Sequence, residues 1–86
     1  MNKFTLTVSS PDGNLFKDDV IKLTLRGAEG DLAVLAGHTP FITSVKSGEC
    51  HIHISDSEVK TATTEGGLLC VADNTVTFLT GRFSWL

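Results

Sequence analysis

The chain has 86 residues, of which 41% are hydrophobic and 20% are charged, a composition typical of one small folded domain rather than of a disordered chain. Seven lysines and arginines stand against ten acids, and the net charge of −3 provides no basic surface for a nucleic-acid backbone. No window approaches the roughly 18 consecutive apolar residues of a membrane-spanning helix, and the first residues lack the apolar core of a signal peptide. We therefore expect a cytosolic chain without a nucleic-acid partner.

Period-two alternation of apolar and polar residues is the main pattern in the chain, and it predicts short, half-buried β-strands. The first such run covers residues 4–9, the second 21–26, the third 50–55 and the fourth 75–79. Their apolar positions, which we expect to face a core, are Phe4, Leu6, Val8, Ile21, Leu23, Leu25, Cys50, Ile52, Ile54, Val76 and Phe78. No stretch carries the 3.6-residue apolar stripe of an amphipathic helix.

Turn-forming residues separate these runs at fairly even spacing. The turn signals are Pro-Asp-Gly at residues 11–13, Lys-Ser-Gly-Glu at 46–49, Ser-Asp-Ser-Glu at 55–58, Glu-Gly-Gly at 65–67 and Ala-Asp-Asn at 72–74. Many short strands with regular turns are typical of an all-β antiparallel sandwich or barrel. The uniform pattern predicts a single domain over residues 1–86.

The two cysteines, Cys50 and Cys70, are too far apart in the sequence to form a close redox motif, and two cysteines alone make a weak metal site. In a cytosolic chain they are expected to be reduced thiols that pack as small core hydrophobes.

The stretch at residues 26–40 contains three glycines, Gly27, Gly30 and Gly37, whose spacing suggests a phosphate-binding loop. Such a loop ends in Gly-Lys-Ser/Thr and leads into a helix, whose N-terminus faces the anion. Here Gly30 is followed by an acid, Asp31, and then by a strand-like apolar run. We therefore predict that these glycines serve tight turns and close strand approach.

The three histidines are the candidates for a metal site. His51 and His53 are two residues apart on a predicted strand and share a face, but nothing in the sequence places His38 beside them. Because zinc requires three or four ligands, we predict that the pair lies on the polar face of an amphipathic strand and that the chain holds no metal. A small metal-binding or ligand-binding sandwich that uses these histidines is the alternative function.

Nucleophilic and acid–base catalysis find no support in the sequence. Ser9 and Ser10 precede a Pro-Asp-Gly turn and do not lie in a Gly-x-Ser-x-Gly elbow. Asp18 and Asp19 are adjacent, so that on a strand they point to opposite faces and cannot act as a pair on one substrate. We predict no catalytic residue.

Three segments carry a resemblance to a known family: "SSPDGNLF" at residues 9–16, "GAEGDLAVLAGHTPFITSVKSG" at 27–48 and "EGGLLCVADNTVTFL" at 65–79. Together they resemble the N-terminal domain of the epsilon subunit of F-type ATP synthase. The resemblance implies a flattened antiparallel β-sandwich of about ten short strands, in agreement with the pattern of strands and turns. It also implies a non-catalytic rotor subunit of the central stalk, without a cofactor, whose partners are the gamma subunit and the c-ring.

The resemblance further implies a place for such a domain: peripheral, at the cytoplasmic face of the cell inner membrane, within the ATP synthase complex. ATP synthesis and hydrolysis occur on the beta subunits of that complex. The isolated domain is expected to be a monomer. A domain of the same fold in an alternative ion-translocating ATPase fits the resemblance equally well, because the coupling ion is chosen by the c-ring.

Carried over by position, the resemblance assigns Glu29, Gly30 and Asp31 to a loop that faces the c-ring. An acidic turn suits docking on polar or basic loop tips. The positions that match the gamma-facing side are Ser10, His38, Phe41, Ile42 and Thr43. Because adjacent strand residues point to opposite faces, one of Phe41 and Ile42 should be core and the other available to the partner. A patch of exposed apolar residues with a polar rim is expected on one face of the sandwich.

Several positions depart from the family pattern. Asp31 stands where glutamate is usual, and Ala33 and Ala36 replace a usual glycine and proline. The C-terminal helical hairpin of typical members is absent, so that ATP sensing and conformational inhibition are not carried over. Either the sequence is a trimmed domain or the subunit is naturally short, and the aromatic ending favours the second. On this interpretation Phe83 and Trp85 share a strand face and cover apolar surface.

Overall fold

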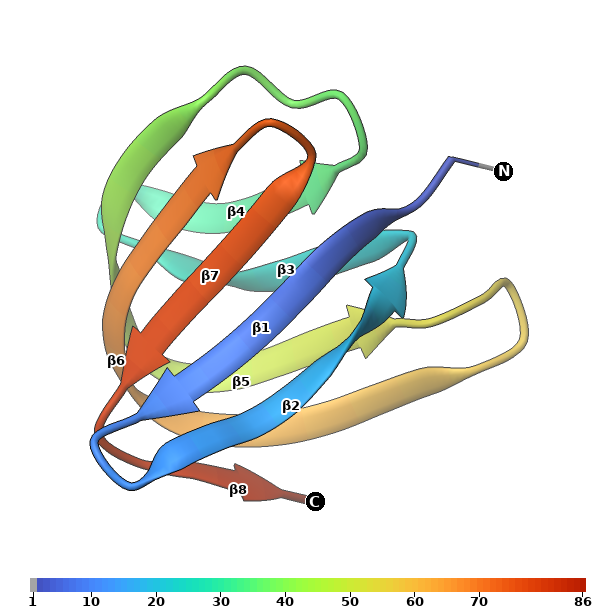
Figure 1. Ribbon diagram of the computed structural model, residues 1–86. Helices are drawn as coiled ribbons and strands as arrows, with labels where there is room; N and C mark the ends of the chain where they lie inside the picture. Colours follow the sequence, from blue (N-terminus) through green and yellow to red (C-terminus); the bar gives the residue numbers. More distant parts are fainter. Residues whose placement is uncertain (1) are drawn as a thin grey trace.

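The computed structural model describes residues 2–86, which form an all-β fold (Figure 1). The strands are β1 (Phe4–Ser10), β2 (Gly13–Val20), β3 (Lys22–Gly27), β4 (Gly30–Leu35), β5 (Phe41–His53), β6 (Val59–Ala72), β7 (Thr75–Thr80) and β8 (Phe83–Trp85). Residues 2–86 contain no helix that is long and apolar enough to cross a membrane. The predicted fold class is confirmed.

The strands follow the order β2-β1-β7-β6-β5-β3-β4, and β8 pairs with β6. Neighbouring strands are antiparallel except for β1 and β7, which run parallel. The N-terminal strand is therefore inserted between β2 and the late strand β7. This pairing places the first strand and the late strand β7 side by side in one layer.

Two long strands, β5 and β6, pass through positions where the sequence predicts turns. The signals at residues 46–49 and 65–67 were predicted as chain reversals, and this prediction was wrong. The β5–β6 ladder continues across both glycines, with Lys46 opposite Gly66 and Gly48 opposite Thr64. Both glycines have positive φ, 154° at Gly48 and 100° at Gly66, and they mark a bend rather than a turn. For this reason residues 2–86 form eight strands instead of the expected ten or so.

The bend divides the strands into two layers (Figure 1). The first layer contains β2, β1, β7, the second half of β6 and the first half of β5. The second layer contains β8, the first half of β6, the second half of β5, β3 and β4. Since β5 and β6 contribute to both layers, these two strands connect the layers directly at the bend.

A buried hydroxyl pair stabilises the bend. The side-chain oxygens of Thr64 and Thr80 lie 2.8 Å apart, and Thr64 accepts a hydrogen bond from the Gly66 amide. The Thr80 hydroxyl is also 2.8 Å from the Gly66 carbonyl oxygen and 3.0 Å from that of Arg82. These are the two buried polar side chains among the described residues, and they satisfy each other in a place where water does not reach.

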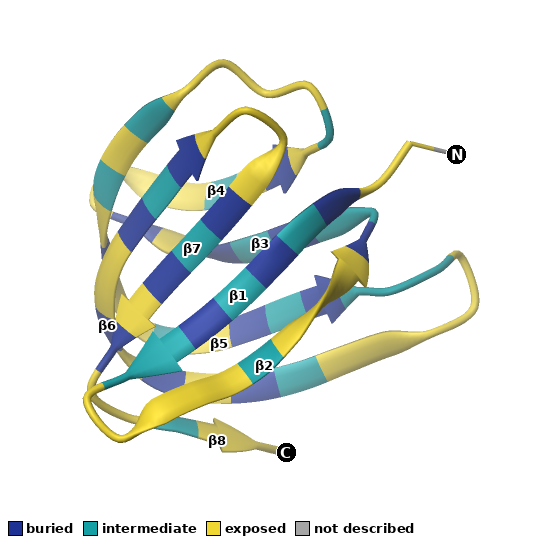
Figure 2. Cartoon of the chain, viewed as in Figure 1, coloured by how far each residue is buried: buried dark blue, intermediate teal, exposed yellow. Residues whose placement is uncertain are grey.

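The core lies between the layers and is built from alternating positions, as Figure 2 shows along β1 and β7. Most of the predicted core positions are confirmed, because Phe4, Leu6 and Val8 on β1 and their counterparts on the other strands are buried. Ile21 and Ile54 are only half-buried, since they lie just outside β3 and β5. Cys50 is buried as predicted, whereas Cys70 is half-buried on the outer side of β6.

The C-terminal strand β8 closes one side of the sandwich. Phe83 packs against the core, and its ring centroid lies 5.0 Å from that of Trp85, in an edge-on arrangement. The Trp85 ring also meets Phe16 of β2 at 5.7 Å, and the Lys60 ammonium lies 5.5 Å from its centroid. Phe83 and Trp85 therefore share a face and connect the second layer to the edge of the first.

Candidate partner-binding surfaces

The outer face of the first layer carries four apolar side chains, Ile42, Leu68, Cys70 and Leu79, which we call the apolar patch. Leu68 is directly opposite Leu79 in the β6–β7 ladder, and Cys70 is opposite Ile42 in the β5–β6 ladder. Residues paired in this way point to the same side of a sheet. Ile42 is 69% exposed, Leu79 44% and Leu68 41%. The expected exposed apolar surface is therefore present on one broad face.

Polar residues surround the apolar patch. Thr77 is in register with Cys70, Thr7 is in register with Thr77, and Lys17 continues this row on β2. Ser44 is opposite Leu68 on the β5 side. An apolar centre with a polar rim is the composition of a protein-binding surface rather than of a small-molecule site.

Of the four patch residues, Leu68 and Leu79 were not singled out from the sequence, and Cys70 was expected in the core. Leu68, Leu69, Cys70 and Val71 form a continuous apolar run, of which Leu69 and Val71 are buried and the other two face outward. A strand that is apolar on both faces is covered on both faces. The absence of alternation in this run was the available signal for a second, outward-facing apolar surface.

Phe41, Ile42 and Thr43 begin β5 and divide between its two sides. Phe41 packs against the core and Ile42 is exposed, which confirms that one of the two is core and the other available. Thr43 is half-buried and lies opposite the buried Leu69, so its side chain faces away from the apolar patch. Of these three residues, Ile42 belongs to the patch.

Ser10 and His38 lie at opposite ends of the first layer. Ser10 ends β1, and its hydroxyl accepts a hydrogen bond from the Asp12 amide at 3.2 Å within the β1–β2 turn. His38 lies in the β4–β5 loop, where its Nδ1 is 2.8 Å from the Thr39 carbonyl oxygen and its ring is 4.7 Å from that of Phe41. The structure does not bring Ser10 and His38 together.

The β3–β4 hairpin presents the predicted acidic loop. Gly27 pairs with Gly30 across a two-residue turn formed by Ala28 and Glu29. Gly30 has a φ of 132°, a conformation that residues with a Cβ rarely adopt. Glu29, Gly30 and Asp31 are all exposed at this tip, and Asp31 is opposite Arg26 in the ladder. The tip is an exposed, mainly acidic projection.

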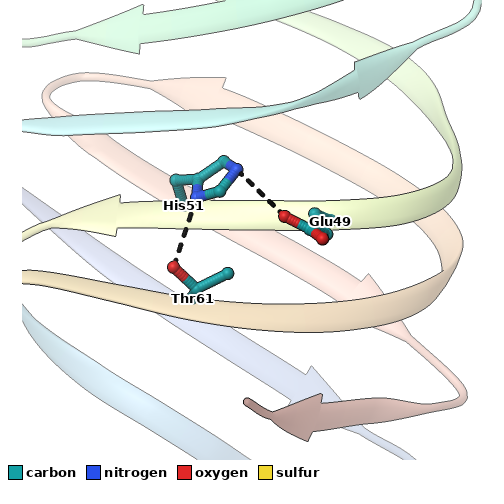
Figure 3. A network of polar contacts seen from close by, with 3 residues as sticks. All are labelled: Glu49, His51 and Thr61. Atoms are coloured by element: carbon teal, nitrogen blue, oxygen red, sulfur yellow. Dashed lines mark hydrogen bonds and ion pairs between the residues drawn. The ribbon is translucent and has the colours of Figure 1, made fainter.

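The outer face of the second layer is polar and contains His51 and His53, as predicted. Figure 3 shows His51 between Glu49, whose carboxylate is 3.5 Å from Nε2, and Thr61, whose hydroxyl is 3.3 Å from Nδ1. His53 is in register with Lys22 of β3. Partial burial lowers the pKa of His53, and the charges of Lys22 and His51 lower it further.

His38 lies in the β4–β5 loop and does not come together with His51 and His53. Within residues 2–86 no group of three or more His, Cys, Asp or Glu side chains is arranged to hold a metal ion. Burial raises the pKa of the Cys50 thiol to about 12, which makes this thiol unreactive at neutral pH.

The fold and these surfaces define a small β-sandwich domain, with an apolar patch on one broad face and an acidic hairpin at its edge. The chain belongs to the family of the ATP synthase Delta/Epsilon chain β-sandwich domain, whose model matches residues 3–86. The chain is 37% identical to the sodium-ion-specific ATP synthase epsilon chain of Acetobacterium woodii over 82 residues. The alignment covers 95% of this chain and 62% of the relative. The chain is 34% identical over 85 residues to the ATP synthase epsilon chain of Clostridium perfringens, with coverage of 99% and 64%.

The chain thus spans less than two thirds of the length of these relatives. Among solved structures, a chain of the Euglena gracilis mitochondrial ATP synthase (OSCP/F1/c-ring) superposes with a TM-score of 0.89 at 24% identity, over 96% of this chain and 53% of that chain. A chain of the central stalk/c-ring structure of the Tetrahymena thermophila mitochondrial ATP synthase superposes with a TM-score of 0.80 at 17% identity. The match covers 95% of this chain and 66% of that chain. At these identities the superpositions establish a shared fold.

Proposed function

We propose that the chain is a non-catalytic subunit of the central rotor stalk of an F-type ATP synthase. The whole enzyme translocates protons or sodium ions. The observation that carries this proposal is the apolar patch on one broad face of a sandwich of the epsilon family. In this role the chain binds the gamma subunit and the c-ring and helps to couple ion flow to ATP synthesis. The chemistry takes place on the beta subunits of the complex.

The apolar patch is the proposed contact with gamma. Burial of a large apolar side chain contributes about 1.5–3 kcal/mol, so that a few such residues sustain a persistent contact. Ile42, the most exposed of them, is the main anchor. Ser10 and His38 lie at the two ends of this layer and form part of the proposed rim. Phe41 and Thr43 support β5 from the inner side.

The β3–β4 hairpin is the proposed contact with the c-ring. Glu29 and Asp31 place two carboxylates on an exposed tip, with Gly30 between them. Exposed charges at the edge of an interface mainly steer the encounter and fix its orientation. The tip is therefore assigned to alignment on the ring rather than to binding strength.

This assignment also gives the location of the chain. As part of the complex it is a peripheral component at the cytoplasmic face of the cell inner membrane, held there by its partners. The coupling ion is a property of the c-ring, so the proposal covers both proton and sodium enzymes, and both the ordinary and the alternative F-type complex.

A co-purification experiment with the gamma subunit tests the proposal. A Leu79→Lys substitution places a charge in the apolar patch and should reduce the affinity for gamma at least about tenfold, because the ammonium loses its hydration when the patch is covered. Val59→Lys is the matched control, since Val59 is 47% exposed but lies on the outer face of the other layer. This control should bind gamma as the parent chain does.

Thermal unfolding of both variants establishes that each is folded before binding is compared. Equal gamma binding by Leu79→Lys and Val59→Lys would contradict the use of the apolar patch. No gamma binding by the parent chain, under conditions where an epsilon chain of the family binds, would contradict the proposed function itself.

A further inference from the structure

A hollow of about 420 Å³ lies on the outer face of the second layer, at the end where β3 begins and where β4 and β5 end. Its polar lining consists of Asn2, Lys22, His53, Ser55 and Asp56, and Leu35 contributes to its apolar wall. Figure 1 shows that these segments meet at one end of the sandwich, near the N-terminus. The apolar patch faces outward from the other layer, so the hollow is separate from the proposed gamma contact.

Two nitrogen-bearing side chains stand side by side in this hollow. Lys22 and His53 are directly opposite each other in the β3–β5 ladder, and their inward neighbours Leu23 and Ile52 are buried. Within the described part of the chain, neither the Lys22 ammonium nor the His53 ring has a hydrogen-bond or ion-pair partner, in contrast to His51, which contacts Glu49. The end of the hollow that holds this pair is therefore electropositive and uncompensated.

Charged side chains of both signs surround the hollow. Lys22 supplies a positive charge and His53 adds a second one when its ring is protonated, with His51 two residues away on the same face of β5. Asp56, in the loop after β5, is the acid that lines the hollow. The Glu49 carboxylate lies beyond His51. An anion between Lys22 and His53 would meet attraction from Lys22 and from the protonated His53 ring, and repulsion from Asp56 in the lining.

We propose that this hollow is a binding site for a phosphate-type oxyanion. A tetrahedral oxyanion accepts hydrogen bonds from several directions, and the lining offers the Lys22 ammonium, the protonated His53 ring, the Ser55 hydroxyl and the Asn2 amide. The Ser55 hydroxyl accepts a hydrogen bond from the Ser57 amide at 3.3 Å and lies 3.3 Å from the Ser57 hydroxyl, a partner that it can exchange for a ligand oxygen. The site goes beyond the proposed rotor function and does not depend on it.

Titration of the histidine rings by NMR tests this site, with inorganic phosphate as the probe and sodium chloride at matched ionic strength as the reference. A bound oxyanion favours the protonated ring, so the pKa of His53 should rise by about one unit in phosphate, which corresponds to tenfold tighter binding to the protonated form. The pKa values of His51 and His38 should change much less.

Two variants and one control sharpen the result. Lys22→Gln should abolish the phosphate-dependent rise at His53, and Asp56→Asn should make it appear at several-fold lower phosphate concentration. Lys46→Gln is the control, because Lys46 is an exposed lysine on the half of β5 that belongs to the first layer. It should leave the response unchanged.

A second arm distinguishes a free phosphate from a lipid headgroup. Vesicles that contain phosphatidic acid in phosphatidylcholine are compared with vesicles of phosphatidylcholine alone. Binding that depends on phosphatidic acid and on Lys22 would support the site with a lipid as the source, even without a response to inorganic phosphate. Equal shifts of all three histidines, or no Lys22-dependent response to either probe, would overturn the proposal.

Discussion

Gly67 lies where β6 passes closest to β7 at the bend between the layers. A Cβ at this position would overlap with the Leu79 carbonyl oxygen, and a Cβ at the preceding Gly66 would overlap with that of Val45. In both places the obstacle is backbone, which cannot move aside as a flexible side chain can. The two glycines are therefore required by close approach of strands, and not only by the shape of a turn.

We expect Gly67→Ala to lower the free energy of unfolding by roughly 3 kcal/mol or more, because the added methyl group must displace the β7 backbone. Gly81→Ala is the matched control. A Cβ there would meet the end of the Glu65 side chain, which can rotate away, so a change of less than about 1 kcal/mol is expected. Urea unfolding of both variants measures the difference. Equal stability of the two variants would contradict the requirement for close approach.

His53 provides a pH dependence whose sign follows from its surroundings. Its pKa is lowered in the folded chain by partial burial first, and then by Lys22 and His51. The unfolded chain, with a histidine pKa of about 6.5, therefore binds the proton more readily. The stability contribution is fully present above the unfolded pKa and decreases as the pH falls through it towards the folded pKa.

Urea unfolding between about pH 5 and pH 8 tests this dependence, which sets in as the pH falls through the ordinary histidine pKa of about 6.5. We expect the parent chain to lose stability on acidification, and His53→Gln to lose less over the same range. In Lys22→Gln the dependence should be weaker but still present, since burial is the larger cause. Identical pH profiles for the parent chain and His53→Gln would show that this histidine is not responsible.

At the scale of elements, β5 and β6 decide the architecture and β8 completes it. The ladder between β5 and β6 keeps one register through the bend, so both strands change layer together. The Thr64–Thr80 hydroxyl pair fills the buried corner that results. β8 then adds to the first half of β6 and sets Phe83 and Trp85 against the edge of the sandwich.

Removal of residues 83–86 should lower the stability of the chain by roughly 2–4 kcal/mol, because Phe83 leaves the core and Phe16 loses its contact with Trp85. Trp85→Ala alone should cost less, since Trp85 is 45% exposed. Thermal unfolding and solubility are the measurements. A shortened chain with an unchanged melting temperature and solubility would show that β8 covers no important apolar surface.

At the scale of the whole molecule, the two broad faces differ in chemistry. The first layer presents the apolar patch, the second presents Lys22, His51 and His53, and the acidic hairpin projects at the edge. Because these surfaces are formed by different residues, on the outer sides of the two layers and at the β3–β4 hairpin, a substitution in one should not disturb the others. The proposed partners can therefore be lost separately.

Reversal of charge at the hairpin, with Glu29→Lys and Asp31→Lys combined, should weaken association with the c-ring severalfold and make it less dependent on salt, while gamma binding is retained. Asp18→Lys is the control, because Asp18 is an exposed acid on β2. Assembly of each variant with a complex of gamma and the c-ring, at low and high salt, measures the effect. Equal assembly by all variants would remove the hairpin from the proposed ring contact.

Particular residues show how far the sequence could be interpreted. The alternation at Phe4, Leu6 and Val8 predicted strand and core correctly, because a half-buried strand has no other way to separate apolar from polar side chains. Phe41 and Ile42 were correctly expected to divide between core and surface. Gly48 and Gly66 were misread as turns, since a positive φ serves a reversal and a bend equally well, and the choice depends on the strands beside them.

The chain alone determined an all-β fold, the strand faces and the acidic tip at Glu29–Asp31, because these depend on side-chain alternation and on turn chemistry between neighbours in the sequence. Tertiary structure decided which apolar residues remain outside. Leu68 and Leu69 are identical in type and adjacent, yet only Leu69 is buried, since the sheet can cover one of its sides with the opposite layer. The apolar patch and the Lys22–His53 hollow exist only because distant strands pair in this register.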